Sequence, residues 1–208
     1  YSFMFTIKQT KSGAKTLIIN GKSIHSSYNP VIESNTFINK LNIKQNTRLF
    51  IIIGAGLGYL KSSIYETFPG AKILSIYLDK KIYDLSSISD YNWYFGSEIN
   101  LSNLLLKFIP DFQLHEATVV KWMPCTEIFT TRTFEIEQIV HQFFLERKGT
   151  IFTTGYFGFK WIKNLFNNFS IITKTGSICK IDLPVIIAAS GPSLSKSFDL
   201  LKKYRKYF

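Results

Sequence analysis

The feature that most constrains the fold is a glycine-rich turn directly after a continuous apolar run. Leu49 to Ile53 are all large and apolar, and Gly54, Gly56 and Gly58 follow at alternate positions. An apolar run without polar alternation is typical of a strand covered on both faces of a parallel sheet. Glycines allow a sharp turn and a close approach to a ligand, and the N-terminus of the next helix favours an anion. The pattern predicts a strand, a tight turn and a helix, with Gly54, Gly56 and Gly58 as candidate ligand-binding residues.

Strand and helix patterns alternate after this turn. The first helix is expected to run to about Phe68, and a second strand is expected from Lys72 to Tyr77. A later strand is expected from Thr118 to Trp122, and two aromatic-rich helices from Thr133 to Arg147 and from Phe157 to Phe169. This alternation predicts an α/β domain with a doubly wound, Rossmann-like sheet.

The N-terminal segment has the pattern of a small β-meander. Strands are expected from Phe3 to Lys8, from Lys15 to Ile19 and from Ser23 to His25. Asn20-Gly21 is the preferred pair for a two-residue type I′ turn between the last two of these strands. Asn29-Pro30 then predicts a helix start, because Asn caps well and Pro at the first helical position loses no hydrogen bond.

A second strand-turn-helix unit is expected near the C-terminus. Pro184 to Ala189 is an apolar strand pattern, and a helix is expected from Ser193 onward. Backbone N–H groups of such a turn can bind an anion, and the Ser193 hydroxyl can add a hydrogen bond. Gly191, Pro192 and Ser193 are therefore candidate phosphate-binding residues. Spacing alone leaves the alternative open that this is an ordinary turn with Ser193 near the helix cap.

These patterns divide the chain into three parts. Residues 1–47 form the meander and its helix, residues 48–175 the Rossmann-like domain, and residues 184–208 the first βα unit of a second domain of similar type. The expected fold class is therefore α/β. Because a parallel strand must pair with a neighbour, either this last unit packs onto the first domain or a second domain is cut off just after it begins. The second reading, a domain truncated at Phe208, is the expected one.

The ligand of the Gly54 turn is not decided by the motif. Its G-x-G-x-G spacing is closer to the S-adenosylmethionine turn of methyltransferases than to the dinucleotide motif. Such folds place an acid at the end of the next strand to hold ribose hydroxyls. Tyr77 stands at that place here, and Asp79 comes two residues later. The glycines can instead serve close packing between strand and helix.

Composition limits the partner classes. The net charge is +11, but the lysines are spread along the chain, which argues against nucleic acid; a basic cluster lies at residues 202–206. An anionic small ligand fits this charge equally well. No apolar run is long enough for a membrane span and no signal peptide is visible, so a cytoplasmic protein is expected. Cys125, Cys179 and the three histidines have no metal-ligand spacing, and no catalytic constellation is apparent.

Two segments together resemble a known family. Ile24 to Pro30 with Glu33, followed by Ile53 to Tyr59, resembles the N-terminal region of the motility accessory factor (Maf) family. Pro184 to Leu194, which reads PVIIAASGPSL, resembles the opening of the central domain that Maf proteins share with 6-hydroxymethylpterin diphosphokinases of the MptE type. The sequence departs from the family at Tyr77, where an acid is frequent.

The resemblance implies the N-terminal part of a flagellin glycosyltransferase. Such an enzyme moves a nonulosonic acid from its CMP-activated form to Ser or Thr of flagellin or another protein acceptor. It also implies that the second domain is sialyltransferase-like, and that Gly191, Pro192 and Ser193 line its pocket for the CMP-sugar. This chain is then expected to be inactive alone. Three alternatives remain: an MptE-like pyrophosphokinase that uses the same turn for a pyrophosphate, a non-catalytic module that binds flagellin or another partner, and a methyltransferase that uses the Gly54 turn.

Overall fold

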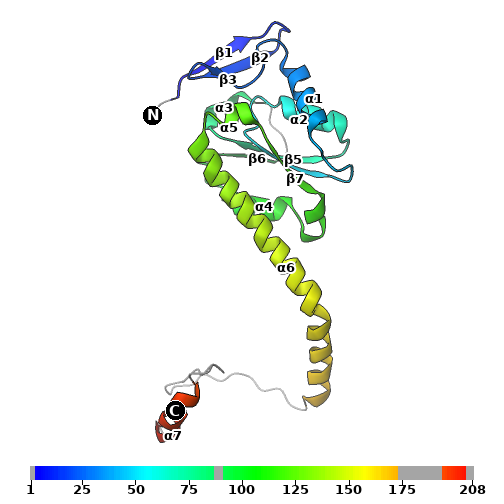
Figure 1. Ribbon diagram of the computed structural model, residues 1–208, viewed down its shortest axis with the longest axis vertical. Helices are drawn as coiled ribbons and strands as arrows, with labels where there is room; N and C mark the ends of the chain where they lie inside the picture. Colours follow the sequence, from blue (N-terminus) through cyan, green and yellow to red (C-terminus); the bar gives the residue numbers. More distant parts are fainter. Residues whose placement is uncertain (1–2, 87–90, 173–193, 205–208) are drawn as a thin grey trace. The chain divides into compact units, whose positions relative to one another are not determined.

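The computed structural model describes residues 3–86, 91–172 and 194–204. By its internal contacts the chain divides into two compact units, Tyr1–Phe157 and Gly158–Phe208 (Figure 1). The expected division into residues 1–47, 48–175 and 184–208 remains a prediction. In the first unit, a four-stranded parallel sheet is flanked by helices, and a separate small antiparallel sheet lies beside it.

The small sheet is the N-terminal β-meander. Strands β1 (Phe5–Gln9), β2 (Lys15–Ile19) and β3 (Lys22–Ser23) pair antiparallel in chain order. Asn20 and Gly21 have φ angles of 48° and 80°, and a type I′ turn requires positive values at both positions. The expected extent of the third strand was wrong. It ends at Ser23, because His25 turns away to contact the glycine-rich turn.

The parallel sheet has the order β6-β5-β4-β7. Its strands are β4 (Leu49–Ile53), β5 (Lys72–Tyr77), β6 (Tyr91–Tyr94) and β7 (Ala117–Lys121). All five residues of β4 are buried, as expected for a strand covered on both faces. The chain moves outward from β4 through β5 to β6, and then returns to the other side of β4 as β7. The direction of winding therefore reverses between β4 and β7.

Five helices and a 3₁₀ turn accompany this sheet before the long helix α6. They are α1 (Pro30–Lys40), α2 (Tyr59–Thr67), α3 (Lys80–Leu85), α4 (Leu101–Phe108), the 3₁₀ turn Asp111–Glu116 and α5 (Met123–Thr126). Helix α1 begins as expected, since the Asn29 side chain accepts from the N–H groups of Val31 and Ile32. One core contains residues from both sheets and from the helices.

The two helices expected after β7 are one continuous helix, α6 (Thr130–Ile171). Gly149 and Gly155 do not interrupt it, because a glycine inside a helix costs only about 1 kcal/mol. Thr133, Ile136, Val140 and Phe143 form its buried stripe. Within the described residues, the helix expected from Ser193 is α7 (Leu194–Tyr204). Gly191, Pro192, Ser193 and the strand expected before them lie outside those residues. Across the described ranges, every helix is too short or too polar to span a membrane.

Candidate functional site

The glycine-rich turn lies at the carboxyl ends of β4 and β7, where the winding of the sheet reverses. Ligands of open α/β sheets bind in the crevice at such a point. Gly54, Gly56 and Gly58 have φ angles of 79°, 58° and 94°, in the region that favours glycine. Gly58 is also the residue before α2. The local backbone is therefore the predicted one.

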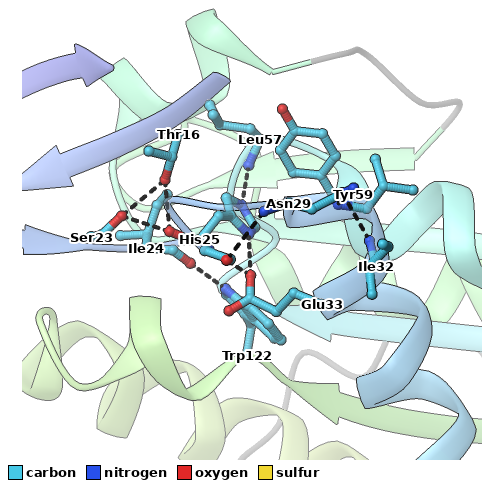
Figure 2. A network of polar contacts seen from close by, with 12 residues as sticks. Thr16, Ser23, Ile24, His25, Asn29, Ile32, Glu33, Leu57, Tyr59 and Trp122 are labelled. Carbon is cyan, nitrogen blue, oxygen red and sulfur yellow. Dashed lines mark hydrogen bonds and ion pairs between the residues drawn. The ribbon is translucent and has the colours of Figure 1, made fainter. Parts of the chain in front are cut away.

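The His25 side chain occupies the space beside Gly56 in which a Cβ atom of a larger residue would lie. Its Nε2 atom accepts a hydrogen bond from the N–H of Leu57 at 3.0 Å (Figure 2). A Cβ atom on Gly56 would lie 2.8 Å from His25 Cε1 and even closer to Nε2. The imidazole thus takes a backbone N–H of the turn, which a nucleotide-binding turn would offer to an anion. We call this contact between the His25 ring and Gly56–Leu57 the His25 contact.

Neighbouring side chains fix the ring from several directions. Trp122, directly after β7, stacks on it with ring centroids 5.5 Å apart, and Tyr59 meets it edge-on at 5.0 Å. The Trp122 indole N–H donates to the carbonyl of Ile24 at 2.7 Å, which holds the backbone just before His25. Figure 2 shows these groups converging from the meander, from α2 and from the end of β7.

The backbone carbonyl of His25 is also held. It accepts hydrogen bonds from the hydroxyl of Thr16 at 2.9 Å and from that of Ser23 at 2.6 Å. Both hydroxyls belong to the meander, and Thr16 is itself buried. The meander and the parallel sheet are therefore joined through His25, which is anchored at its carbonyl on one side and at its ring on the other.

The hydrogen bond from Leu57 sets the protonation of His25. Because Nε2 accepts, the single proton of the neutral ring is on Nδ1. Nδ1 is buried without a hydrogen-bond partner among the described residues, and the nearest carboxylate oxygen, Glu33 Oε2, is 3.9 Å away. That oxygen accepts from the N–H of Ser26 at 2.7 Å. Burial lowers the pKa of His25 to about 4, so the ring is neutral at physiological pH.

Burial acts on Glu33 in the opposite direction. It raises the pKa of this carboxyl, although the hydrogen bond from Ser26 favours the ionised form. Glu33 also borders a groove of about 420 Å³ that Trp122, Phe37 and Lys40 line with it. The groove carries one carboxylate, Glu33, one ammonium group, Lys40, and the hydroxyl of Thr36.

The first glycine of the turn packs against helix α5. A Cβ atom on Gly54 would lie 3.1 Å from Thr126 Cγ2 and 3.2 Å from Cys125 Cβ. Cys125 is fully buried, and burial raises the pKa of its thiol to about 12. A thiol with such a pKa is a poor nucleophile and a poor metal ligand at neutral pH. Gly54 thus brings strand β4 and α5 together.

No acid is free at the end of β5 to hold a ribose. Tyr77 is buried there and meets Tyr83 edge-on at 5.4 Å. Asp79, two residues later, accepts from the N–H of Lys81 at 2.9 Å and caps α3. Its other oxygen accepts from Arg132 at 2.7 Å, and the same guanidinium nitrogen donates to the carbonyl of Leu78. Both oxygens of Asp79 therefore have protein partners.

A cavity of about 650 Å³ lies between α4 and α6, away from these strand ends, and Ser102, Gln142, Glu146 and Arg147 are among its lining residues. Arg147 pairs there with Asp111. Ligands of parallel sheets bind at the carboxyl ends of the strands, where the glycine turn lies and this cavity does not.

Sequence reasoning identified the glycine turn but missed its partner. Gly54, Gly56 and Gly58 form the expected turn, and their role as ligand-binding residues stays a prediction. His25, Trp122 and Arg132 were not recognised as residues of the site. The only signal was that His25 lies in the first of the two segments with the family resemblance. Among residues 3–86, 91–172 and 194–204 there is no group of three or more potential metal ligands.

Comparisons with known proteins gave no additional assignment: no family model, no curated protein and no solved structure matches the chain.

Proposed function

We propose that this chain is the N-terminal part of a Maf-type glycosyltransferase, in which the unit up to Phe157 is a non-catalytic module. The donor, a CMP-activated nonulosonic acid, would bind at Gly191, Pro192 and Ser193, and flagellin or another protein would be the acceptor. The observation that carries the non-catalytic role is the His25 contact. It fills the place where the glycine turn of a methyltransferase or dehydrogenase holds its cofactor.

We assign the parallel sheet to the Rossmann-like class. Numbered by position in the chain, its strands have the order 3-2-1-4, which is the first part of the order 3-2-1-4-5-6 of dinucleotide-binding domains. The glycine turn follows the first strand of this sheet, as in that class. We therefore propose that the sheet has a nucleotide-binding architecture in which the glycine turn makes a structural contact instead of holding a nucleotide.

The family assignment gains support from the way the two N-terminal motifs meet. His25 belongs to the first motif, and Leu57 and Tyr59 belong to the second. The hydrogen bond at 3.0 Å and the ring contact at 5.0 Å join them directly. Glu33, which accompanies the first motif, lies beside the same ring. The motifs therefore have a shared physical role, which explains their occurrence in one chain.

The non-catalytic role is tested with S-adenosylmethionine. We expect calorimetry on the purified chain to give no binding, because His25 covers the turn and Asp79 is already paired. A charged acceptor for a ribose hydroxyl contributes about 1.5–3 kcal/mol, and that contribution is missing here. Low-micromolar binding that Gly56→Val abolishes would show that the turn is a cofactor site and would overturn the proposal.

The glycosyltransferase role is tested in a protein that carries the whole expected central domain. CMP should bind, and Gly191→Val should weaken binding strongly, because a β-branched side chain blocks backbone approach. Ser193→Ala should cost about 1.5–3 kcal/mol, the value of one hydrogen bond to a charged group. Undiminished CMP binding by Gly191→Val would remove the nucleotide role of this turn. Pyrophosphate transfer from ATP to a hydroxymethylpterin would instead favour the MptE-like alternative.

A further inference from the structure

The second unit combines exposed apolar side chains with a strong positive charge. In residues 158–172 every side chain is exposed apart from Gly158, which is half-buried. Large apolar residues nevertheless make up more than half of this segment; they are Phe159, Trp161, Ile162, Leu165, Phe166, Phe169, Ile171 and Ile172. Phe159 and Phe169 are each 79% exposed. A surface of this kind on a water-soluble domain marks an interaction site.

The charge of this unit identifies the kind of partner. Residues 158–208 contain nine lysines and arginines and two aspartates, which gives +7 of the chain's net charge of +11. The segment 158–172 has Lys160 and Lys163 and no acid at all. Because two copies of such a unit repel each other, self-association through this surface is disfavoured. The complementary partner is an anionic one.

Helix α7 has the same character. Leu194, Phe198 and Leu201 recur at helical spacing and form one face, and Lys196 and Lys203 lie on the opposite side. Phe198 is 52% exposed, and the Lys202 ammonium group lies 5.1 Å from the centre of its ring. Two separate helical segments of this unit thus combine apolar and basic residues.

The aliphatic residues distinguish between a lipid surface and a nucleic acid. Single-stranded nucleic acid is bound by aromatic rings that stack on bases and by basic residues that contact phosphates. Ile162, Leu165 and Leu201 have neither an aromatic ring to stack on a base nor a positive charge to contact a phosphate. An anionic membrane surface binds both the apolar and the basic side chains. Aromatic and aliphatic side chains enter the boundary between headgroups and acyl chains, and lysines contact the lipid phosphates.

We propose that the unit from Gly158 onward binds the surface of anionic phospholipid membranes, through the apolar side chains of residues 158–172 and the lysines of the same segment. This goes beyond the proposed glycosyltransferase function and does not depend on it.

The chain contains its own fluorescent reporter. Of its three tryptophans, Trp93 and Trp122 are buried and Trp161 is 52% exposed. The experiment mixes the 208-residue chain with vesicles of phosphatidylcholine alone, or with vesicles in which about a third of this lipid is replaced by phosphatidylglycerol. We expect co-sedimentation and a blue shift of Trp161 emission only with the anionic vesicles and not with the neutral ones. Binding should weaken in about 0.5 M salt. Trp161→Phe should remove the shift and retain most of the binding.

Matched variants test the two contributions separately. Lys160→Glu with Lys163→Glu should weaken vesicle binding at least about tenfold, whereas Lys8→Glu with Lys22→Glu, which changes the net charge equally, should have little effect. Phe166→Ser should weaken binding about tenfold, while Phe134→Ser, at an exposed position of the same helix in the first unit, should not. Circular dichroism checks that each variant keeps its helices.

Three results would overturn the proposal. The first is equal recovery with neutral and anionic vesicles, including no binding to either. The second is a dimer in sedimentation whose Trp161 is shielded from acrylamide, which would assign the surface to a second copy. The third is tighter binding to single-stranded oligothymidine than to anionic vesicles, with quenching of Trp161, which would assign it to nucleic acid.

Discussion

The substitution Gly56→Ala tests the His25 contact most directly. The new Cβ atom would lie 2.8 Å from His25 Cε1, a distance that real Cβ atoms do not show, so the buried ring must move. Gly70→Ala is the matched control. Gly70 also has a positive φ angle, of 80° against 58° for Gly56, but its Cβ would meet nothing within 4 Å.

The expected magnitudes follow from this difference. An alanine in the left-handed region costs about 1–2 kcal/mol, and both variants incur this cost. Gly56→Ala also displaces His25 and leaves the N–H of Leu57 without its acceptor, which costs a further 1–3 kcal/mol or so. We therefore expect the free energy of unfolding to fall by about 2–5 kcal/mol for Gly56→Ala and by about 1–2 kcal/mol for Gly70→Ala.

Urea unfolding, followed by fluorescence and circular dichroism, measures both values. Adding His25→Ala completes a double-mutant cycle, in which the ring that clashes is absent. The double variant should be more stable than the sum of the single effects predicts, by about 1–3 kcal/mol. If Gly56→Ala costs no more than Gly70→Ala, or if its effect is simply additive with His25→Ala, the ring does not lie over the turn and the reasoning fails.

Two further predictions concern buried titratable groups. Because burial lowers the pKa of His25 to about 4 from an ordinary value of 6.5, the unfolded chain binds a proton that the folded chain does not. Above pH 6.5 the ring is neutral in both states, and the free energy of unfolding does not depend on its protonation. As the pH drops towards 4, the free energy of unfolding should fall by about 3 kcal/mol, because the unfolded chain binds the extra proton. His25→Gln should flatten this slope in urea titrations; equal slopes in the two proteins would contradict it. The Cys125 thiol, whose pKa burial raises to about 12, should react with a thiol reagent at least about a hundredfold more slowly in native than in unfolded Cys179→Ser protein. Stoichiometric labelling in native buffer at pH 8 would refute this.

Local rules predicted the elements that depend on local physics. The left-handed turn at Asn20-Gly21, the Asn29 cap and the glycine turn after β4 each follow from the conformational preferences of the residues present. The apolar run of β4 was sufficient to predict a strand buried on both faces. In each case the decisive interactions lie within a few residues of one another, and for that reason they can be read in the sequence.

Elements with weak local patterns were missed. Strand β6 has four residues at the edge of the sheet, mostly half-buried, and shows neither apolar continuity nor clean alternation. Its pairing with β5 makes it a strand. The continuity of α6 was missed because its glycines look like breaks, although the cost of each is small against the backbone hydrogen bonds of a helix of 42 residues.

The sequence by itself determined that a glycine turn would follow β4, while the tertiary structure alone decided what covers that turn. His25 and Leu57 are 32 positions apart, and Ile24 and Trp122 are 98 positions apart. No local preference selects these pairs. They meet because the meander packs at the carboxyl ends of β4 and β7, where a buried N–H and a buried carbonyl each need a partner. A glycine turn of this kind leaves enough space for a phosphate or for an imidazole. In this protein the imidazole of His25 occupies that space, because distant segments pack together there.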